Sequence, residues 1–429
     1  MKTNSSFKWK RAIHIVILSF ILIPLSGCWS ASEINNLAIV NVLAVDENSS
    51  GQMKVTAVIV KPNSVFTNPG STGGTLGKSS LIETTTGKSL YEAIGRLSKA
   101  VPESLYFGHL NVILFGERAA REKMTTALDF FKRQTDFRPN ITVLVAKGPA
   151  QKLVQAVPIM NTTIGLELRD LAESNRFDET NMVQDISKFT EQLLSNTTDP
   201  YTGVIRTAAE TGVNIPNNKH NMEKKKDPRG NKKKGSTKPK STKPKMLGLS
   251  GTAVFKNGRL KGYLNERETQ GLLAIKGELT NGIIVLDCGG NRKGTVSLAV
   301  KDTNSQLIPK LEGETPEMTV KVDVDAEIGD ISCPGFNVNT ASIDRLNQKL
   351  ADYMKFSAMA VLNQAKNKWQ TDIFGFGESI FRKDPATWNK LEDHWREGKL
   401  RQMDVNLKVS ANILRHGLFK DSVKANESR

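Results

Sequence analysis

The feature that most constrains the fold is a basic stretch near the middle of the chain, Asn217–Lys245. It contains twelve Lys or Arg residues against two acids, is rich in Pro, Gly and Ser, and has no aromatic or branched aliphatic side chain. Such a composition cannot bury enough apolar surface to offset the entropy of ordering the chain, so it predicts a disordered basic linker. A solvated linker and electrostatic attachment to anionic lipid headgroups or wall polymers remain alternative roles.

The linker divides the chain into two predicted folded parts. Residues 28–216 are expected to form an N-terminal α/β region of one or two subdomains, and residues 246–420 a C-terminal α+β domain.

The net charge of +16 suggests nucleic-acid binding until the charge is located along the chain. The linker and four cations among the first eleven residues carry nearly all of it. Because the remaining residues are close to neutral, no basic groove and no nucleic-acid partner are expected.

The N-terminus has the organisation of an exported lipoprotein. Lys8, Lys10 and Arg11 precede the apolar run Ile13–Leu25, and Ser26, Gly27 and Cys28 follow at once. A run of about thirteen residues is shorter than the roughly 20 that a membrane-spanning helix needs. Residues 1–27 are therefore predicted to be a signal peptide, and Cys28 the lipidation site that anchors the mature protein in membrane lipid. The alternative is an ordinary cleaved signal with a coincidental Cys.

Before the linker, segments with strand and helix patterns alternate. Strands are predicted at Leu37–Val45, Met53–Val60, His109–Phe115 and Ile141–Ala146, helices at Leu90–Lys99 and Arg118–Lys132, and a loop at Ser64–Ser80.

After the linker, the pattern predicts mixed sheets with packed helices. Asn257 and Gly258 form a strong hairpin signal between Ser250–Phe255 and Arg259–Leu264. Further strands are predicted at Ile283–Asp287, Thr295–Lys301, Met318–Ile328 and Val405–Ile413, and a helix at Glu266–Ile275. A long amphipathic helix capped by Ser342 should lie across the sheet. The fold class expected for the whole chain is α+β and multidomain.

No catalytic, metal-binding or cofactor-binding constellation is recognisable. The five His residues show no spacing typical of metal ligands. Asp323 and Asp325 are interpreted as the solvent face of a strand rather than a calcium loop. Gly375–Gly377 are expected to end the long helix, and His109 to be a buried residue with a hydrogen bond to the backbone. No enzyme activity is predicted.

Cys288 and Cys333 are the only other cysteines. In an exported protein they could form a disulfide, but two separate thiols fit the sequence as well.

The chain resembles the Ger(x)C family of spore germination proteins, the C subunits of nutrient germinant receptors. The residues that carry the resemblance in the N-terminal part are Cys28, Trp29, Glu33, Ile34, Asn35, Leu37, Ala38, Asp46, Gly87–Ala93, Phe107, Gly108, His109, Gly116, Glu117, Ala120, Leu128, Asp129, Phe130, Arg133 and Arg138. Those in the C-terminal part are Gly251–Phe255, Gly262–Leu264, Glu266–Gly271, Asp372, Ile373, Gly375, Phe376, Gly377, Pro385, Trp388 and Trp395. The basic linker departs from the family pattern.

The resemblance implies a lipoprotein on the outer face of the cell membrane, which in a spore is the inner membrane. It also implies assembly with an A subunit and a transporter-like B subunit. Such a protein is expected to need no cofactor and to have no enzyme activity. The alternative is an extracytoplasmic substrate-binding lipoprotein of a transporter, which needs a ligand cleft between two doubly wound lobes.

Overall fold

The architecture was established from a computed structural model, which describes Trp9, His14 and residues 36–60, 80–156, 163–173, 180–207, 247–288, 293–312 and 315–415. Cys28, the linker and the predicted loop Ser64–Ser80, apart from Ser80, lie outside these residues. The described part of the chain has no helix long and apolar enough to cross a membrane.

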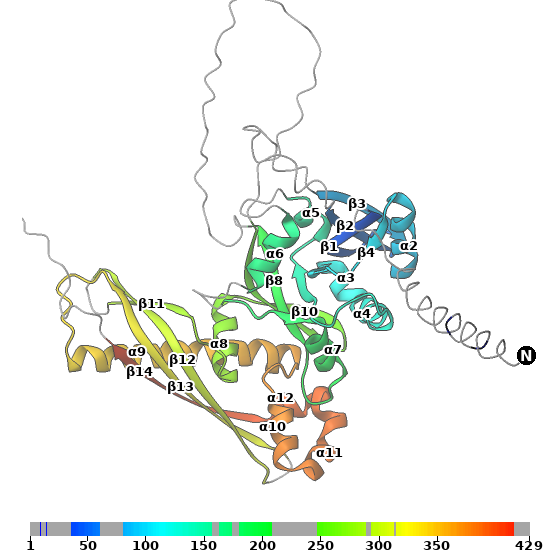
Figure 1. Cartoon of the computed structure of the whole chain (residues 1–429). Helices are drawn as coiled ribbons and strands as arrows, with labels where there is room; N and C mark the ends of the chain where they lie inside the picture. The colour runs from blue at the N-terminus through cyan, green and yellow to red at the C-terminus, as the bar shows by residue number, and fades with distance from the viewer. Residues whose placement is uncertain are drawn as a thin grey trace, which may run out of the picture.

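A large mixed sheet forms the N-terminal body (Figure 1). Its strand order is β10-β9-β8-β6-β5-β1-β2-β3, with β4 beside β1 and β7 beside β6. The four neighbouring strands β8, β6, β5 and β1 run parallel to one another, and β1 and β2 form an antiparallel hairpin. The strands are β1 Leu37–Glu47, β2 Met53–Val60, β3 Ser80–Gly87, β4 Ser104–Tyr106, β5 Val112–Gly116, β6 Thr142–Ala146, β7 Gln184–Asp185, β8 Tyr201–Thr207, β9 Leu247–Lys256 and β10 Arg259–Leu264.

The residues of strands such as β5 are buried on both sides of the sheet, because helices cover both of its faces. One face packs against α2 Leu90–Ala100, α3 Glu117–Glu122, α4 Met124–Arg133 and α7 Ile186–Leu194. The other packs against α5 Ala150–Val154 and α6 Ile164–Glu173. The prediction of one helix over Arg118–Lys132 was wrong, because the backbone leaves helical geometry at Lys123.

The sequence after the linker contributes to the same sheet. β9 pairs antiparallel with β8, so segments on either side of residues 208–246 are hydrogen-bonded neighbours. The predicted hairpin β9–β10 is confirmed, with Asn257 and Gly258 both at positive φ. The boundaries of independently folding domains stay a prediction.

The C-terminal sheet has the order β11-β12-β13-β14 and lies to one side of the N-terminal body (Figure 1). Its strands are β11 Ile283–Asp287, β12 Thr295–Lys310, β13 Glu317–Ile331 and β14 Asp404–Arg415. In β13, Val320, Val322 and Val324 are buried, and Asp323 is exposed, as their alternation predicted. Asp325, which was expected on the solvent face, is half-buried.

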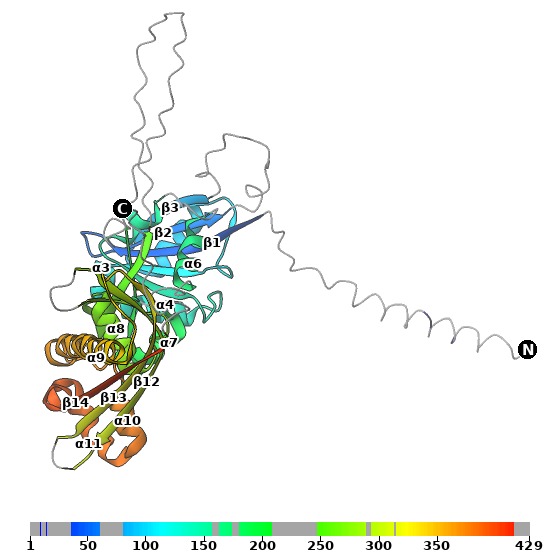
Figure 2. The ribbon, with the colours of Figure 1, turned by 90° about the vertical axis from the view of Figure 1, so that its left-hand side faces the viewer.

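The long helix is α9 Thr340–Val361, which continues as a π-helical segment, η5 Leu362–Trp369. It lies along one face of the C-terminal sheet (Figure 2). Its N-cap is Asn339 rather than Ser342. Ser342 stands three residues later and closes a capping box with Asn339.

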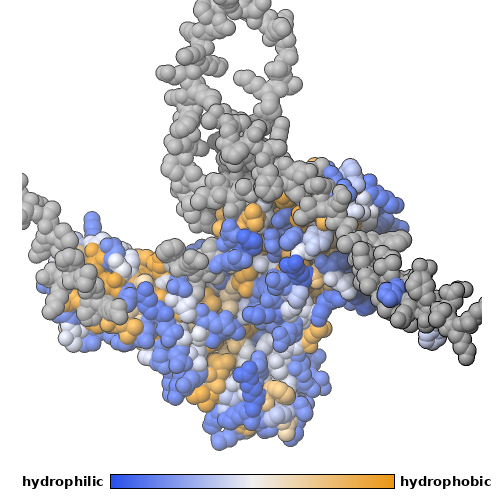
Figure 3. Space-filling model, viewed as in Figure 1, coloured by the Kyte–Doolittle hydropathy of each residue, from blue (hydrophilic) through white to orange (hydrophobic). Residues whose placement is uncertain are grey.

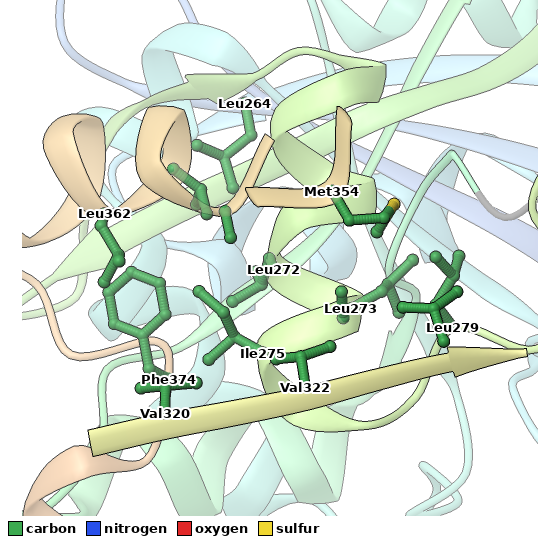
Figure 4. Packing of buried hydrophobic residues seen from close by; sticks show 14 of the residues in the cluster. Leu264, Leu272, Leu273, Ile275, Leu279, Val320, Val322, Met354, Leu362 and Phe374 are labelled. Carbon is green, nitrogen blue, oxygen red and sulfur yellow. The ribbon is translucent and has the colours of Figure 1, made fainter. Parts of the chain in front are cut away.

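Helix α8 Glu266–Lys276 packs between the two bodies, and each of its residues from Thr269 to Ile275 is buried. In Figure 4 its residues Leu272 and Ile275 lie among Leu264 of β10, Val320 of β13 and side chains of α9. The core therefore runs without interruption from the end of the large sheet into the C-terminal sheet.

Cys288 and Cys333 form a disulfide, with Cα atoms 5.8 Å apart. The bond links the end of β11 to the segment after β13. The choice that the sequence left open is thus decided in favour of the disulfide, and the α+β fold class is confirmed.

Limited trypsin digestion should cut first within residues 217–245, because the composition there predicts disorder. The two fragments should stay together on native size-exclusion chromatography and separate only in denaturant, because β8 and β9 pair across the cut. Fragments that separate without denaturant would contradict this pairing.

Candidate functional site

Gly375, Phe376, Gly377 and Trp395, which belong to the C-terminal family resemblance, meet around one buried carboxylate, that of Asp372. Oδ1 accepts hydrogen bonds from the backbone N–H groups of Phe374, Gly375 and Phe376, at 3.0–3.2 Å. Oδ2 accepts from the N–H of Gly377 at 2.7 Å. The indole N–H of Trp395 also donates to Oδ2, at 3.0 Å. Burial raises the pKa of Asp372, whereas these hydrogen bonds favour the ionised form.

This arrangement corrects the prediction that Gly375–Gly377 end the long helix. That helix ends at Trp369, and Gln370 follows in the left-handed conformation. Gly375 is instead the N-cap of α10, Phe376–Lys383, at a φ of 85°. The glycines thus allow the chain to wrap around Asp372.

Asp199 binds the same segment from the N-terminal body. Its N–H donates to the carbonyl of Asp372 at 2.7 Å, and its Oδ2 accepts from the N–H of Asp372 at 2.8 Å. Its Oδ1 lies 3.0 Å from Nε of Arg396, an ion pair by distance that lacks hydrogen-bond alignment. Arg396 also donates to the carbonyls of Ser195 and Thr198, at 2.9 and 2.6 Å.

Aromatic side chains fill the space behind these carboxylates. Trp388, on α11 Pro385–His394, and Trp395 are both fully buried and meet edge to face, with ring centroids 5.4 Å apart. Gly377 admits the Trp388 ring, because a Cβ there would lie 2.7 Å from that ring and from the carbonyl of Thr197. We call Asp199, Asp372, Trp388, Trp395 and Arg396 the interdomain junction.

A cavity of about 680 Å³ opens beside the junction, between α7 and α8. Tyr201, Gln192 and Lys276 line it, with Glu278 and Glu378 also on its wall. The Lys276 ammonium lies 3.4 Å from the Glu278 carboxylate and 5.7 Å from the centre of the Tyr201 ring. Burial lowers the pKa of Lys276, but these two neighbours together outweigh it and raise that pKa. The lining is polar and could hold a small polar molecule, yet it pairs no nucleophile with a general base.

The sequence-predicted residues fall in different places. His109 was expected to be buried in a strand, but it is exposed in a turn before β5. Its ring meets the edge of the Tyr106 ring, with the ring centroids 5.7 Å apart. His394 lies exposed on the surface near Glu397. Cys28 lies outside the described residues. Asp199 and Arg396 were missed, because their partners are distant in sequence and neither belongs to a local motif.

The fold and the junction define a two-part mixed α/β protein whose characteristic residues hold its parts together. The family model for the spore germination protein N-terminal domain matches residues 30–207, and that for the spore germination B3/GerAC-like C-terminal domain matches residues 250–417. The chain therefore belongs to this GerAC-like, or Ger(x)C, family of spore germination proteins. Residues 208–249, which include the linker, lie outside both matches.

Relatives cover nearly the whole chain. Spore germination protein KC of Bacillus subtilis (strain 168) is 29% identical over 96% of each chain. Spore germination protein B3 of the same organism is 24% identical over 97% of this chain and 99% of its own. The crystal structure of the GerBC protein has a similar fold, with a TM-score of 0.51 and 20% identity, covering 87% of this chain and 97% of that one.

Replacing Asp372 with alanine should destabilise the protein strongly, because four backbone N–H groups and one indole N–H lose their buried acceptor. We expect a loss on the order of 3–5 kcal/mol in the free energy of unfolding, measured by urea denaturation. Asp384→Ala is the matched control, because Asp384 caps α11 at the surface. Asp384→Ala should lower the free energy of unfolding by a clearly smaller amount. Equal decreases for the two variants would contradict the special role of Asp372.

The pH dependence of stability should report on Asp199. Burial raises the pKa of Asp199 from 3.8 to about 6, although Arg396 acts in the opposite direction. The folded state then holds this proton more tightly than the unfolded state, so the free energy of unfolding falls as pH rises between these values.

Asp199→Asn cannot ionise and should flatten this fall. Between about pH 4 and pH 6 the free energy of unfolding of the wild type should fall by on the order of 1–3 kcal/mol more than that of the variant. Urea denaturation at a series of pH values measures this difference. Parallel curves for the two proteins would show that Asp199 does not titrate in this range.

Proposed function

We propose that this chain is the lipid-anchored C subunit of a nutrient germinant receptor and is needed for nutrient-triggered spore germination. Cys28 holds it on the outer face of the cell membrane, the inner membrane of the spore, where it assembles with the A and B membrane subunits. It acts by assembly and not by catalysis, and requires no cofactor.

The observation that carries the proposal is the match of both family domains, in order, from residue 30 to residue 417. The first match begins two residues after Cys28, where a lipoprotein's mature part begins. The Cys288–Cys333 disulfide supports export, because such bonds persist mainly outside the cytoplasm.

A transporter's substrate-binding lipoprotein is the alternative that the sequence left open. The polar cavity beside the junction is the feature that favours it. Against it, the C-terminal sheet is largely antiparallel, with one long helix along a face, and is no doubly wound lobe. Family membership favours the receptor subunit.

The anchor is tested by Cys28→Ala. This variant should lose incorporation of labelled palmitate and fall in level in the spore membrane fraction, because no other cysteine can replace the predicted lipid acceptor. The control is Cys288→Ala combined with Cys333→Ala, which keeps Cys28 and should keep the label. Full labelling of Cys28→Ala would refute the anchor.

The same membranes test assembly. Capture of the affinity-tagged wild-type chain after detergent solubilisation should recover the A and B subunits with it. Recovery of the chain alone, from membranes that contain all three proteins, would contradict the proposed complex.

A further inference from the structure

A groove lined by aromatic and aliphatic side chains lies on the N-terminal body. It has a volume of about 380 Å³ and is formed by α2, β4, α4 and the segments that follow β4 and α4. Phe107 and Phe130 each pack against Phe137, with ring centroids 5.0 and 5.8 Å apart, and Tyr91 meets the edge of Phe130 at 6.3 Å.

Tyr91, Phe130 and Phe137 line the groove itself, and Tyr106 belongs to β4, which forms one of its walls. Tyr91 is 69% exposed and Tyr106 is 37% exposed, while Phe130 and Phe137 are half-buried. We call Tyr91, Tyr106, Phe130 and Phe137 the aromatic face. Tyrosine combines an apolar ring with a polar hydroxyl, and this combination favours the boundary between lipid and water.

The position of this face is tied to the start of β1, the first strand that the structure describes. β4 pairs in parallel with the first residues of β1, with Leu37 opposite Ser104 and Ile39 opposite Tyr106. Neighbouring strands lie about 4.8 Å apart, so Leu37 begins beside the groove. Cys28 is nine residues earlier and can be at most about 30 Å from Leu37 along an extended chain. A lipid on Cys28 therefore keeps this face close to the bilayer.

The charge around the groove fits an anionic lipid surface. Three exposed cations stand close in sequence to residues that line it: Lys99 follows Ser98, Lys132 comes two residues after Phe130, and Arg138 follows Phe137. None of the three forms an ion pair with another residue that the structure describes. Asp136 at the rim opposes them in part. Exposed cations beside a bilayer attract anionic headgroups, at about 1 kcal/mol each near the surface.

The exposed apolar residues of the C-terminal part are not tied to the start of β1 in this way. Ile283 and Val285 are exposed on β11, and hydrophobic surface is visible toward that end of the C-terminal sheet (Figure 3). β11 lies on the opposite side of the molecule from α2 and β4 (Figure 1). Phe356, 61% exposed on α9, likewise belongs to the C-terminal part.

We propose that the aromatic face rests on the headgroup region of the membrane, so that the chain is held in one orientation by its lipid and by this surface together. The inference rests on the proposed anchoring through Cys28. It adds an orientation, with α2, β4 and α4 toward lipid and the C-terminal sheet directed away.

The test uses the full mature, lipidated chain in vesicles of phosphatidylcholine and phosphatidylglycerol with brominated acyl chains, which quench nearby tryptophan. Trp29 is first changed to phenylalanine, because it adjoins the anchor. Tyr91→Trp then places a probe on the aromatic face, and Phe356→Trp is the matched control at a similarly exposed aromatic position.

Flotation with the vesicles reports anchoring, and quenching reports orientation. We expect both variants to float. After the fluorescence of the Trp29→Phe parent chain is subtracted, the added tryptophan of Tyr91→Trp should be quenched at least about twofold more than that of Phe356→Trp. Failure to float would refute the anchor itself. Flotation with equal quenching, or with no quenching of the Tyr91→Trp probe, would overturn the orientation and would favour a protein partner on the aromatic face.

Discussion

The buried carboxylate of Asp372 is the interaction on which the two-part structure depends. A charged group out of water is costly unless all its acceptor sites are used, and five N–H groups use them here. Four of these donors are backbone groups of residues 374–377, so the carboxylate fixes a loop and the start of α10. The fifth, Trp395, ties this loop to the segment that leads into β14.

Asp199 extends the same network into the N-terminal body. Two hydrogen bonds join Asp199 and Asp372, one from the Asp199 N–H to the Asp372 carbonyl and one from the Asp372 N–H to the Asp199 carboxylate. Arg396 donates to the carbonyls of residues 195 and 198. Together with α8 in the shared core, this network connects the N-terminal body to the C-terminal sheet by both polar and apolar contacts.

Local patterns in the sequence predicted much of the fold. The Asn257–Gly258 hairpin, the alternation in β13 and the long helix were all recognisable, because each depends on residues close in sequence. Long-range choices were not predictable: the pairing of β8 with β9 across the linker, the disulfide, and the role of Asp199 depend on tertiary contacts. His109 was misplaced because an apolar neighbourhood in sequence became a turn at the surface. The capping error at Ser342 arose because a capping box contains two plausible caps, Asn339 and Ser342.

The location of the family-like residues indicates what kind of constraint they satisfy. Asp372, Trp388 and Trp395 are fully buried, and Gly377 admits one of these rings, so they cannot themselves form a surface that meets another subunit. Their role is to set the relation between the N-terminal body and the C-terminal sheet. Any residue that contacts another protein has to lie elsewhere, on exposed elements. Because the junction fixes this relation through buried polar contacts, the C-terminal sheet is presented in a defined position relative to the N-terminal body.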